Sequence, residues 1–332
     1  MPNGRKRIVA ISATLISLLI ALVGAGLIVA TPSATAKPDL ETVKKQVEKY
    51  DHEAEQASER FNDARVKLEA TRTKLDALNA DLTRQDQVVD EMRQQVATMV
   101  VDQYQGDALS TTSQVVLSNN PDAFLDNLNA VSAYNSQRAQ VMKEFGTQLD
   151  RLKLRKAAVQ VEAARLQKLQ DTMAAQKARI DEKAAKAKAI LNDLEAEARA
   201  KILSGGWTGA LPNVEASGRA AAAVRFAMAQ VGKAYVYGAA GPNAYDCSGL
   251  TMRAWGAAGV GLPHSSSAQQ GSGTRVSESQ LRPGDLVFYY SPVSHVGMYI
   301  GHGLIVNALN PGAGVRVSGL HSMPYSGAVR PG

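Results

Sequence analysis

Between residues 40 and 99, apolar side chains recur at alternating steps of three and four positions. The series runs from Leu40 to Met99, and only Thr71 and Gln85 put polar side chains into it. An apolar seam with a 3.5-residue spacing, sustained over so many turns, is typical of a coiled-coil helix. At a rise of 1.5 Å per residue, the predicted helix is about 90 Å long.

A second seam of the same spacing runs from Met142 to Ala198, and its polar exceptions are Lys156, Gln170 and Lys177. The two seams are nearly equal in length. Equal helices joined by an intervening segment predict an antiparallel hairpin that folds back on itself. Pairing of each helix with another chain is the alternative.

The segment between the seams, roughly residues 105–136, breaks the heptads. Gly106 interrupts the pattern, and Asn120-Pro121 is typical of the start of a new helix, so we expect short tip helices here. The apolar residues of this tip, among them Phe124 and Leu125, have two interpretations. They cap the end of the hairpin, or they form a docking surface for another protein.

The N-terminus has the pattern of an export signal. Basic residues at 5–7 precede an uncharged run over residues 8–30, and Ala34-Thr35-Ala36 is a small-residue cleavage signature. We therefore predict a signal peptide over residues 1–36. Because about 20 apolar residues suffice to span a bilayer, an uncleaved anchor at 8–30 is the alternative. Either interpretation places the remainder outside the cytoplasm, secreted or in the cell envelope.

A Gly- and Pro-bearing linker over residues 204–214 separates the predicted rod, residues 37–203, from a compact domain at 215–332. In this domain, helices are expected over 220–231 and from Cys247 to about Gly259. The strands expected after them lie at 286–290, 296–300, 304–308 and 315–317. Helices followed by an antiparallel meander predict an α+β domain, with helices packed on the sheet.

The formal charge of +6 narrows the choice of partner. Three of these charges lie at residues 5–7, and the compact domain carries eight basic against four acidic residues from Ala210 onward. This mildly basic domain suits an anionic polymer such as a cell wall. It lacks the density of Lys and Arg and the interleaved aromatics of a nucleic-acid-binding protein, so we expect no nucleic-acid partner.

The chain has a single cysteine, Cys247, between Asp246 and Ser248. An apolar run follows it, so we place the thiol at the start of a helix, where free N–H groups and the helix dipole stabilise a thiolate. An unpaired cysteine in an exported protein either bridges two chains or is used as a reactive thiol. A buried, inert cysteine is the alternative.

A thiol nucleophile needs a base and a group that orients the base. His295 opens one predicted strand, and Asn307 lies on the next strand beyond a turn at 301–303, which makes them cross-strand neighbours. His302, inside the turn, is expected to have no role. No metal-binding spacing surrounds Cys247, His295 or His302, so we expect neither a metal nor a cofactor.

Five motifs occur in order in the compact domain. They are Tyr-x-Tyr-Gly from Tyr235, Asp-Cys-Ser-Gly-Leu from Asp246, Leu-Pro-His-Ser-Ser with a later Gln269, Leu-Arg-Pro-Gly-Asp-Leu-Val-Phe, and His-Val-Gly-Met-Tyr-Ile-Gly from His295. Together they resemble the NlpC-type peptidases of bacterial cell walls, which are papain-like enzymes. The resemblance covers roughly residues 215–332 and implies a papain-like fold for this domain.

The resemblance implies that Cys247 is the nucleophile, His295 the base and Asn307 the orienting residue. The family commonly has histidine at the third position, so Asn307 is a departure, as is Gly238-Ala239 in place of Gly-Gly.

The resemblance further implies that Tyr235 and Asp246 lie beside the nucleophile and that Ser248 and Ser265 are neighbours of the substrate pocket. The implied reaction is hydrolysis of peptidoglycan stem peptides, typically between D-glutamate and the diamino acid.

The rod resembles the coiled-coil modules of division-associated hydrolases recruited by the FtsE–FtsX membrane complex, on the basis of the tip segment 119–126. Two functional hypotheses follow. The first is a thiol hydrolase of wall peptides, restrained by the rod until a membrane partner engages its tip. The second is a scaffold whose catalytically silent domain binds wall peptides while the rod recruits division factors.

Overall fold

The computed structural model describes residues 39–105, 121–203, 214 and 216–332. The predicted signal peptide, most of the linker and much of the predicted tip segment, residues 106–120, lie outside these residues. Within the described part of the chain, no helix is both long and apolar enough to cross a membrane.

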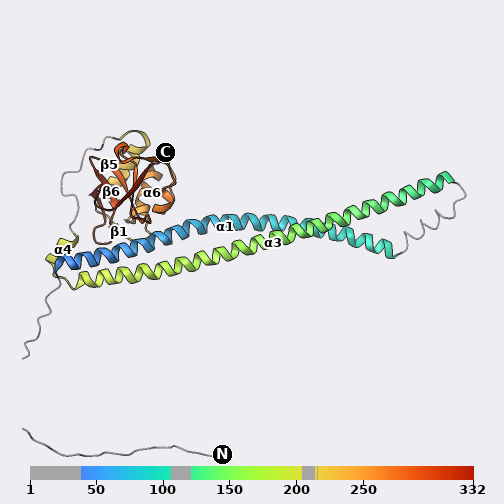
Figure 1. Ribbon diagram of the computed structural model, residues 1–332, viewed down its shortest axis with the longest axis horizontal. Helices are drawn as coiled ribbons and strands as arrows, with labels where there is room; N and C mark the ends of the chain where they lie inside the picture. The colour runs from blue at the N-terminus through green and yellow to red at the C-terminus, as the bar shows by residue number, and fades with distance from the viewer. Residues whose placement is uncertain (1–38, 106–120, 204–213, 215) are drawn as a thin grey trace, which may run out of the picture. The chain divides into compact units, whose positions relative to one another are not determined.

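Two long helices form the N-terminal part of this region. Helix α1 spans Leu40–Tyr104 and helix α3 spans Pro121–Asn192, and they run side by side (Figure 1). The two helices run in opposite directions. Glu53, near the start of α1, pairs with Lys183, near the end of α3, whereas Lys74, further along α1, pairs with Glu162, which is earlier in α3. The predicted antiparallel hairpin within one chain is therefore confirmed.

The predicted seam of α1 is buried against α3 over much of its length. Both of its polar exceptions are buried as well, with Thr71 4% and Gln85 8% exposed. The Gln85 side chain donates to Oε1 of Gln148 on α3 at 2.7 Å, which satisfies an amide that would otherwise be costly to bury. A polar pair at the seam thus links the two helices.

The expectation of a separate tip helix is wrong where it can be compared with the structure. Pro121 begins α3 as predicted, but the helix continues without a break to Asn192. The heptads broken around residue 136 therefore do not end the helix. The second seam is interrupted at its far end instead, because α4 forms a separate helix over Ala196–Leu203.

The C-terminal part combines short helices with a six-stranded sheet. Its helices are α5 (Gly218–Met228), α6 (Cys247–Ala257), α7 (Ser266–Gln269) and the 3₁₀ turn η1 (Glu278–Gln280). The strands of the sheet are β3 (Thr274–Val276), β4 (Leu286–Tyr289), β5 (His295–Gly301), β6 (Leu304–Ala308), β7 (Val315–Gly319) and β8 (Tyr325–Arg330). Their order is β3-β8-β4-β5-β6-β7, with every neighbouring pair antiparallel. The predicted α+β fold is confirmed.

The strands from β4 to β7 lie close to their predicted ranges. Three other features of the domain were not predicted from the sequence pattern. Strands β3 and β8 lack a long apolar run, and β1 (Ala234–Tyr235) pairs with β2 (Ala244–Tyr245) over only two residues, in parallel. Helix α5 begins two residues before the predicted range and ends at Met228 instead of 231. Segments this short carry too few residues for a period to be recognised.

Helix α6 packs on the sheet and thereby fixes the position of Cys247. Its buried Leu250 and Trp255 belong to the same apolar core as Phe288, Met298 and Val306 of the central strands. Trp255 also donates from Nε1 to the carbonyl oxygen of Gly284 at 3.2 Å. The helix that begins at the thiol is therefore anchored to the sheet along its length, by Leu250 and by Trp255.

Substitution of Gly249 by alanine should destabilise the domain. A Cβ there would overlap the backbone carbonyl oxygen of Ala239 and crowd Asp246, so α6 would have to shift. Overpacking of this kind costs about 1–3 kcal/mol. The measurement is the free energy of unfolding by denaturant.

Gly256→Ala is the matched control, because a Cβ at this position on the same helix meets nothing within 4 Å. It should be neutral, or stabilising by up to about 1 kcal/mol. Equal stabilities of the two variants would contradict close packing of the α6 N-terminus.

Candidate active site at the start of α6

Asp246 organises the start of α6. As the N-cap residue it accepts a hydrogen bond from the backbone N–H of Gly249 at 2.6 Å, and a second from the N–H of Gly238 at 2.9 Å. An acidic N-cap satisfies N–H groups that the helix leaves free. Cys247 then occupies the first helical position, 1% exposed. The predicted placement of the thiol at a helix start is confirmed.

His295 and Asn307 lie together on the sheet beneath this helix. Nε2 of His295 is 3.2 Å from Oδ1 of Asn307, whose Nδ2 donates to Oγ of Ser318 at 3.0 Å. The second bond fixes which end of the amide faces the imidazole. Asn307 therefore accepts from the ring, and His295 turns its Nδ1 to the opposite side.

The predicted register of this pair needs correction. Met298 pairs with Val306 and Tyr299 with Ile305, so Asn307 lies opposite Gly297 and diagonal to His295. A β-bulge between Tyr299 and Gly301 shifts the hairpin relative to a simple turn. The contact survives because diagonal neighbours on one face of a sheet are within reach of long side chains.

A face of α1 covers this constellation. Oε1 of Glu55 is 2.5 Å from Nδ1 of His295. Glu55 is 6% and Glu59 3% exposed, and both lie on the polar face of the helix. The imidazole nitrogen that would face a thiol is thus engaged by a carboxylate of the rod.

Glu59 is held by donors from both sides of the thiol. Oε1 accepts from Oγ of Ser248 at 2.8 Å, and the thiol of Cys247 points to the same oxygen at 3.5 Å. Oε2 accepts from the backbone N–H of Ser266 at 2.6 Å and from its Oγ at 2.7 Å. A carboxylate therefore occupies a pocket of hydroxyl and N–H donors next to Cys247.

Further contacts continue along the same face of α1. Asn62 donates to Oδ2 of Asp246 at 3.0 Å, and Asp63 accepts from Oγ of Ser267 at 2.7 Å. Asp63 also accepts from Ser265, and Arg65 contacts Nδ1 of His264. We call Glu55, Glu59, Asn62, Asp63 and Arg65 the polar stripe of α1. It contacts three segments of the domain and closes the site.

The stripe changes the protonation of the two reactive groups. Burial, followed by the charges of Glu59, Glu55 and Asp246, raises the pKa of the Cys247 thiol well above its ordinary value. Burial alone would lower the pKa of His295, but the adjacent Glu55 carboxylate outweighs it and the net shift is upward. These shifts favour an imidazolium beside Glu55 and a thiol in place of a thiolate at Cys247, so they disfavour the nucleophilic form in this closed site.

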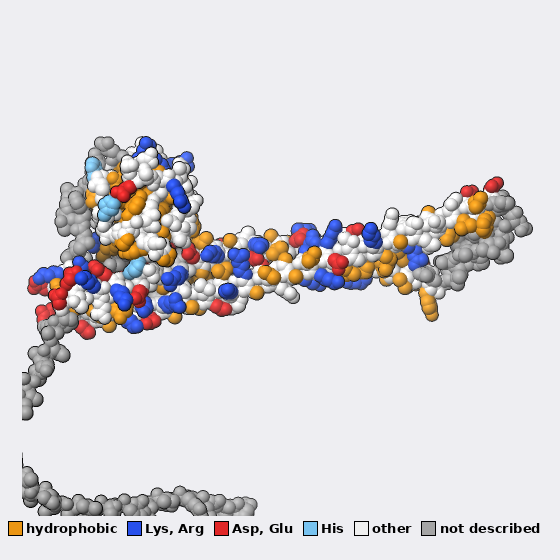
Figure 2. All heavy atoms as spheres, in the orientation of Figure 1, with side chains coloured by type: hydrophobic (Ala, Val, Ile, Leu, Met, Phe, Trp, Pro, Cys, Tyr) orange, Lys and Arg blue, Asp and Glu red, His pale blue; other side chains and the backbone are white. Residues whose placement is uncertain are grey.

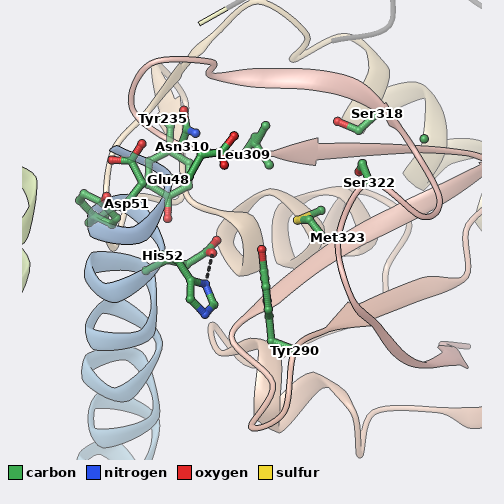
Figure 3. A pocket seen from close by; sticks show the side chains of 13 residues that line it. Glu48, Asp51, His52, Tyr235, Tyr290, Leu309, Asn310, Ser318, Ser322 and Met323 are labelled. Carbon is green, nitrogen blue, oxygen red and sulfur yellow. Dashed lines mark ion pairs between the residues drawn. The ribbon is translucent and has the colours of Figure 1, made fainter. Parts of the chain in front are cut away.

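A cavity of about 540 Å³ lies on one side of α1. Figure 3 shows Asp51 and His52 of α1 on one side of it and Tyr290 and Met323 of the domain on the other. Burial and the charges of Glu55 and Glu48 raise the pKa of Asp51 to about 7. A second cavity, about 420 Å³, lies between a later part of α1 and the domain, so the helix crosses a groove.

The residues predicted to surround the nucleophile do gather here. Tyr235 is 3% exposed and lines the larger cavity, and its hydroxyl has no hydrogen-bond partner among the described residues. Asp246 caps α6, while Ser248 and Ser265 both donate to carboxylates of α1. Their roles toward a substrate stay predictions.

Sequence reasoning missed the polar stripe and its partners His264 and Ser266. On a predicted coiled coil, Glu55 and Glu59 read as an ordinary solvated face. Nothing in their spacing distinguishes a face that docks on a domain about 190 residues away in the chain. His264 and Ser266 belong to the Leu-Pro-His-Ser-Ser motif, and this motif was the one sequence feature that could have marked them as functional residues.

Residues 232–329 match the NlpC/P60 family model. A probable endopeptidase of Corynebacterium glutamicum is 45% identical over 109 residues, which are 33% of this chain and 52% of that protein. A probable endopeptidase of Mycobacterium tuberculosis is 47% identical over 116 residues, 34% of this chain and 30% of that protein. The chain thus spans about half or less of these relatives.

Among solved structures, the NlpC/p60 domain of the peptidoglycan hydrolase SagA is 34% identical. The alignment covers 33% of this chain and 97% of that one, with a TM-score of 0.32.

Release of the polar stripe should make Cys247 reactive. Glu59→Lys places a cation against the donors that hold the carboxylate, and Asn62→Asp places a second carboxylate against Asp246. Losing one partner of a buried charged contact costs about 2–5 kcal/mol, so alkylation of the thiol by iodoacetamide should accelerate by more than about tenfold.

The control for this measurement is Glu69→Lys, because Glu69 is an exposed residue of the same helix. It should leave the alkylation rate unchanged. A wild-type protein that is alkylated as fast as both stripe variants would contradict closure of the site by α1.

Asp51 should make this closure depend on pH. Burial, followed by the charges of Glu55 and Glu48, raises its pKa from the ordinary 3.8 to about 7, and because the domain supplies part of that burial, docking takes up a proton. The contribution of Asp51 to docking is therefore full below about pH 4 and is lost as the pH rises through 7. Asp51→Asn, which mimics the protonated form, should stay docked, and the ratio of wild-type to variant alkylation rates should rise between pH 5 and pH 8.

Taking this ratio removes the intrinsic titration of the thiol, which both proteins share. Asp76→Asn, at an exposed position of α1, should give a ratio that is constant with pH. A constant ratio for Asp51→Asn as well would show that Asp51 does not couple docking to protons.

Proposed function

Because residues 232–329 form an NlpC/P60 domain, we propose that this protein is a cysteine endopeptidase that cleaves the stem peptides of peptidoglycan. The observation that carries the proposal is the cluster of Cys247, His295 and Asn307, which is buried where α1 covers the domain. Nucleophile, base and orienting group are the minimum set for thiol catalysis.

In the mechanism, Nδ1 of His295 takes the proton of the Cys247 thiol and the thiolate attacks the scissile carbonyl carbon. The imidazolium returns this proton to the leaving amine, and an acyl thioester remains on Cys247. Water, deprotonated by the same nitrogen, then hydrolyses the thioester and restores the thiol. Asn307 holds Nε2 of the ring through its fixed carbonyl oxygen, so Nδ1 stays directed at the thiol.

The donors around Glu59 support a substrate that carries a carboxylate. Oγ of Ser248 and both donors of Ser266 bind a carboxylate beside the thiol here. Wall stem peptides contain free carboxylates, and we propose the bond between D-glutamate and the diamino acid as the one cleaved. Tyr235, Asp246, Ser248 and Ser265 are the proposed substrate contacts.

We propose that α1 restrains the enzyme. The stripe places Glu55 on the base and Glu59 in the carboxylate pocket, and it keeps the thiol protonated. A substrate cannot enter until α1 leaves. The rod would therefore hold a folded but inactive enzyme until a partner draws it away.

The distal end of the hairpin, where α1 ends and α3 begins, is the proposed docking site of that partner. Large apolar side chains are exposed there, with Tyr104 92% and Leu125 58% exposed. Figure 2 shows such side chains at this end of the hairpin. We propose the FtsE–FtsX membrane complex as the partner during cell division, and export of the protein to the cell envelope.

The test is release of peptide fragments from purified peptidoglycan, followed by mass analysis of the new ends. Wild-type protein should release little, and Asn62→Asp should release at least about tenfold more because the stripe no longer holds α1 on the site. The double variant Asn62→Asp with Cys247→Ala should release none.

Glu69→Lys again serves as the control and should behave as wild type. If folded Asn62→Asp bound wall peptides without cleaving them, the protein would be a scaffold and the proposed catalysis would be wrong. If wild type and Asn62→Asp cleaved peptidoglycan at equal rates, the proposed peptidase activity would be supported, but the proposed restraint by α1 would be wrong.

A further inference from the structure

Three potential metal ligands meet where α1 touches the domain. One ligand atom each from Glu55, Cys247 and His295 lies within 4.8 Å of the other two, and all three residues are buried. Among the described residues, this is the one group of three or more such side chains so arranged. We expected no metal from the sequence, because no metal-ligand spacing surrounds Cys247 or His295 and Glu55 lies about 190 residues from Cys247 and 240 from His295.

The donor set matches one class of ion. A thiolate sulfur, an imidazole nitrogen and a carboxylate oxygen are the ligands that Zn²⁺ takes in proteins, usually with tetrahedral geometry. Hard cations such as Mg²⁺ and Ca²⁺ prefer oxygen ligands alone. The chemistry of the site therefore selects Zn²⁺ over the common hard cations.

The residues behind the imidazole suit a metal ligand. A metal-bound histidine ordinarily donates its second ring N–H to a carbonyl or carboxylate, which fixes the tautomer. Nε2 of His295 has this partner in Oδ1 of Asn307, at 3.2 Å, and Ser318 holds the amide in that orientation. Nδ1, the nitrogen that faces Glu55, is the one left for the ion.

The spacing of the ligands is close to that of a bound ion. Ligand atoms around tetrahedral Zn²⁺ lie about 3.3–3.8 Å apart, given bond lengths of about 2.0–2.3 Å. The observed separations range from the 2.5 Å contact of Glu55 with His295 to no more than 4.8 Å. Separation of that hydrogen-bonded pair by about 1 Å would admit the ion.

We propose that Zn²⁺ binds between Glu55 of α1 and the Cys247–His295 pair, and that it locks the rod onto the active site. Binding replaces the proton shared by Glu55 and His295 and the proton of the thiol, and both pass to solvent. A water molecule, or Oε1 of Glu59 beside the thiol, completes the coordination. Because one ligand belongs to α1, the ion favours the closed state and opposes its opening.

The inference deepens the proposed restraint, and its test reads the metal directly and not the activity. The affinity of the full-length protein for Zn²⁺ is measured by competition with a chromophoric chelator, and Co²⁺ is used as a spectroscopic probe. Wild type should bind a single Zn²⁺, and Co²⁺ should give the charge-transfer absorption of a thiolate ligand. Cys247→Ser should abolish this absorption.

Two variants test whether α1 supplies a ligand. Glu55→Gln removes the carboxylate itself, whereas Asn62→Asp releases α1 and leaves all three ligands in place. Each should weaken Zn²⁺ binding by at least about tenfold. Loss of a residue that only supports a metal ligand ordinarily costs about this much affinity, so loss of a ligand should cost no less. Glu48→Gln, which lines the adjacent cavity without belonging to the trio, should bind as wild type does.

Equal Zn²⁺ affinity in wild type, Glu55→Gln and Asn62→Asp would overturn the proposal, because the ion would then need nothing from α1. Absence of the thiolate absorption with Co²⁺ would overturn it as well. Neither outcome would affect the proposed peptidase, whose cleavage of peptidoglycan is measured in chelator-treated protein. Failure of that cleavage, conversely, would leave the metal affinity unchanged.

Discussion

The contact between Glu55 and His295 links the long helix α1 to the proposed catalytic base of the domain. An imidazole in a thiol enzyme has to exchange a proton with the thiol, and here its Nδ1 is engaged by a carboxylate at 2.5 Å instead. Burial, followed by the charges of Glu59, Glu55 and Asp246, raises the pKa of the Cys247 thiol. The site is covered by α1, and its electrostatics also disfavour the thiolate form of Cys247, the proposed nucleophile.

The same surface of the domain contacts α1 in this structure and is the proposed binding surface for substrate. Asp246 caps α6 and at the same time accepts from Asn62 of α1, while Ser248 and Ser266 bind the Glu59 carboxylate through groups that face the groove. Each of these donors and acceptors is buried, so each requires a partner. In the proposed open state, substrate or water would have to satisfy them, so the uncovered groove would favour polar ligands.

Much of this architecture follows from the sequence. The 3.5-residue seams predict the hairpin, including its buried exceptions Thr71 and Gln85, and the polar flanks of Cys247 predict its place at a helix start. The His295–Asn307 contact was also predicted, although a bulge near Gly301 makes it diagonal. These features rest on local periods and capping, which a sequence displays directly.

The closure of the site was beyond sequence reasoning, for a physical reason. Glu55 and Glu59 satisfy the pattern of a solvated coiled-coil face as well as they satisfy a docking face, because both need polar residues at helical spacing. Their burial depends on tertiary placement of a distant domain. The continuous α3 was missed for a related reason: broken heptads alter a seam, but a helix needs only its backbone bonds and tolerates the change.

The segment of α1 around residues 54–64 is enclosed on two sides. Ala54, Ala57 and Ala64 are buried, and Glu55, Glu59 and Asn62 are buried with them at neighbouring positions. Elsewhere on the rod, one face is free to accept almost any polar residue. In residues 54–64 almost no position is free in this way. During evolution this short segment should therefore change slowly, and together with the serine-rich loop at 264–267 that it contacts, while the rest of the helix changes freely.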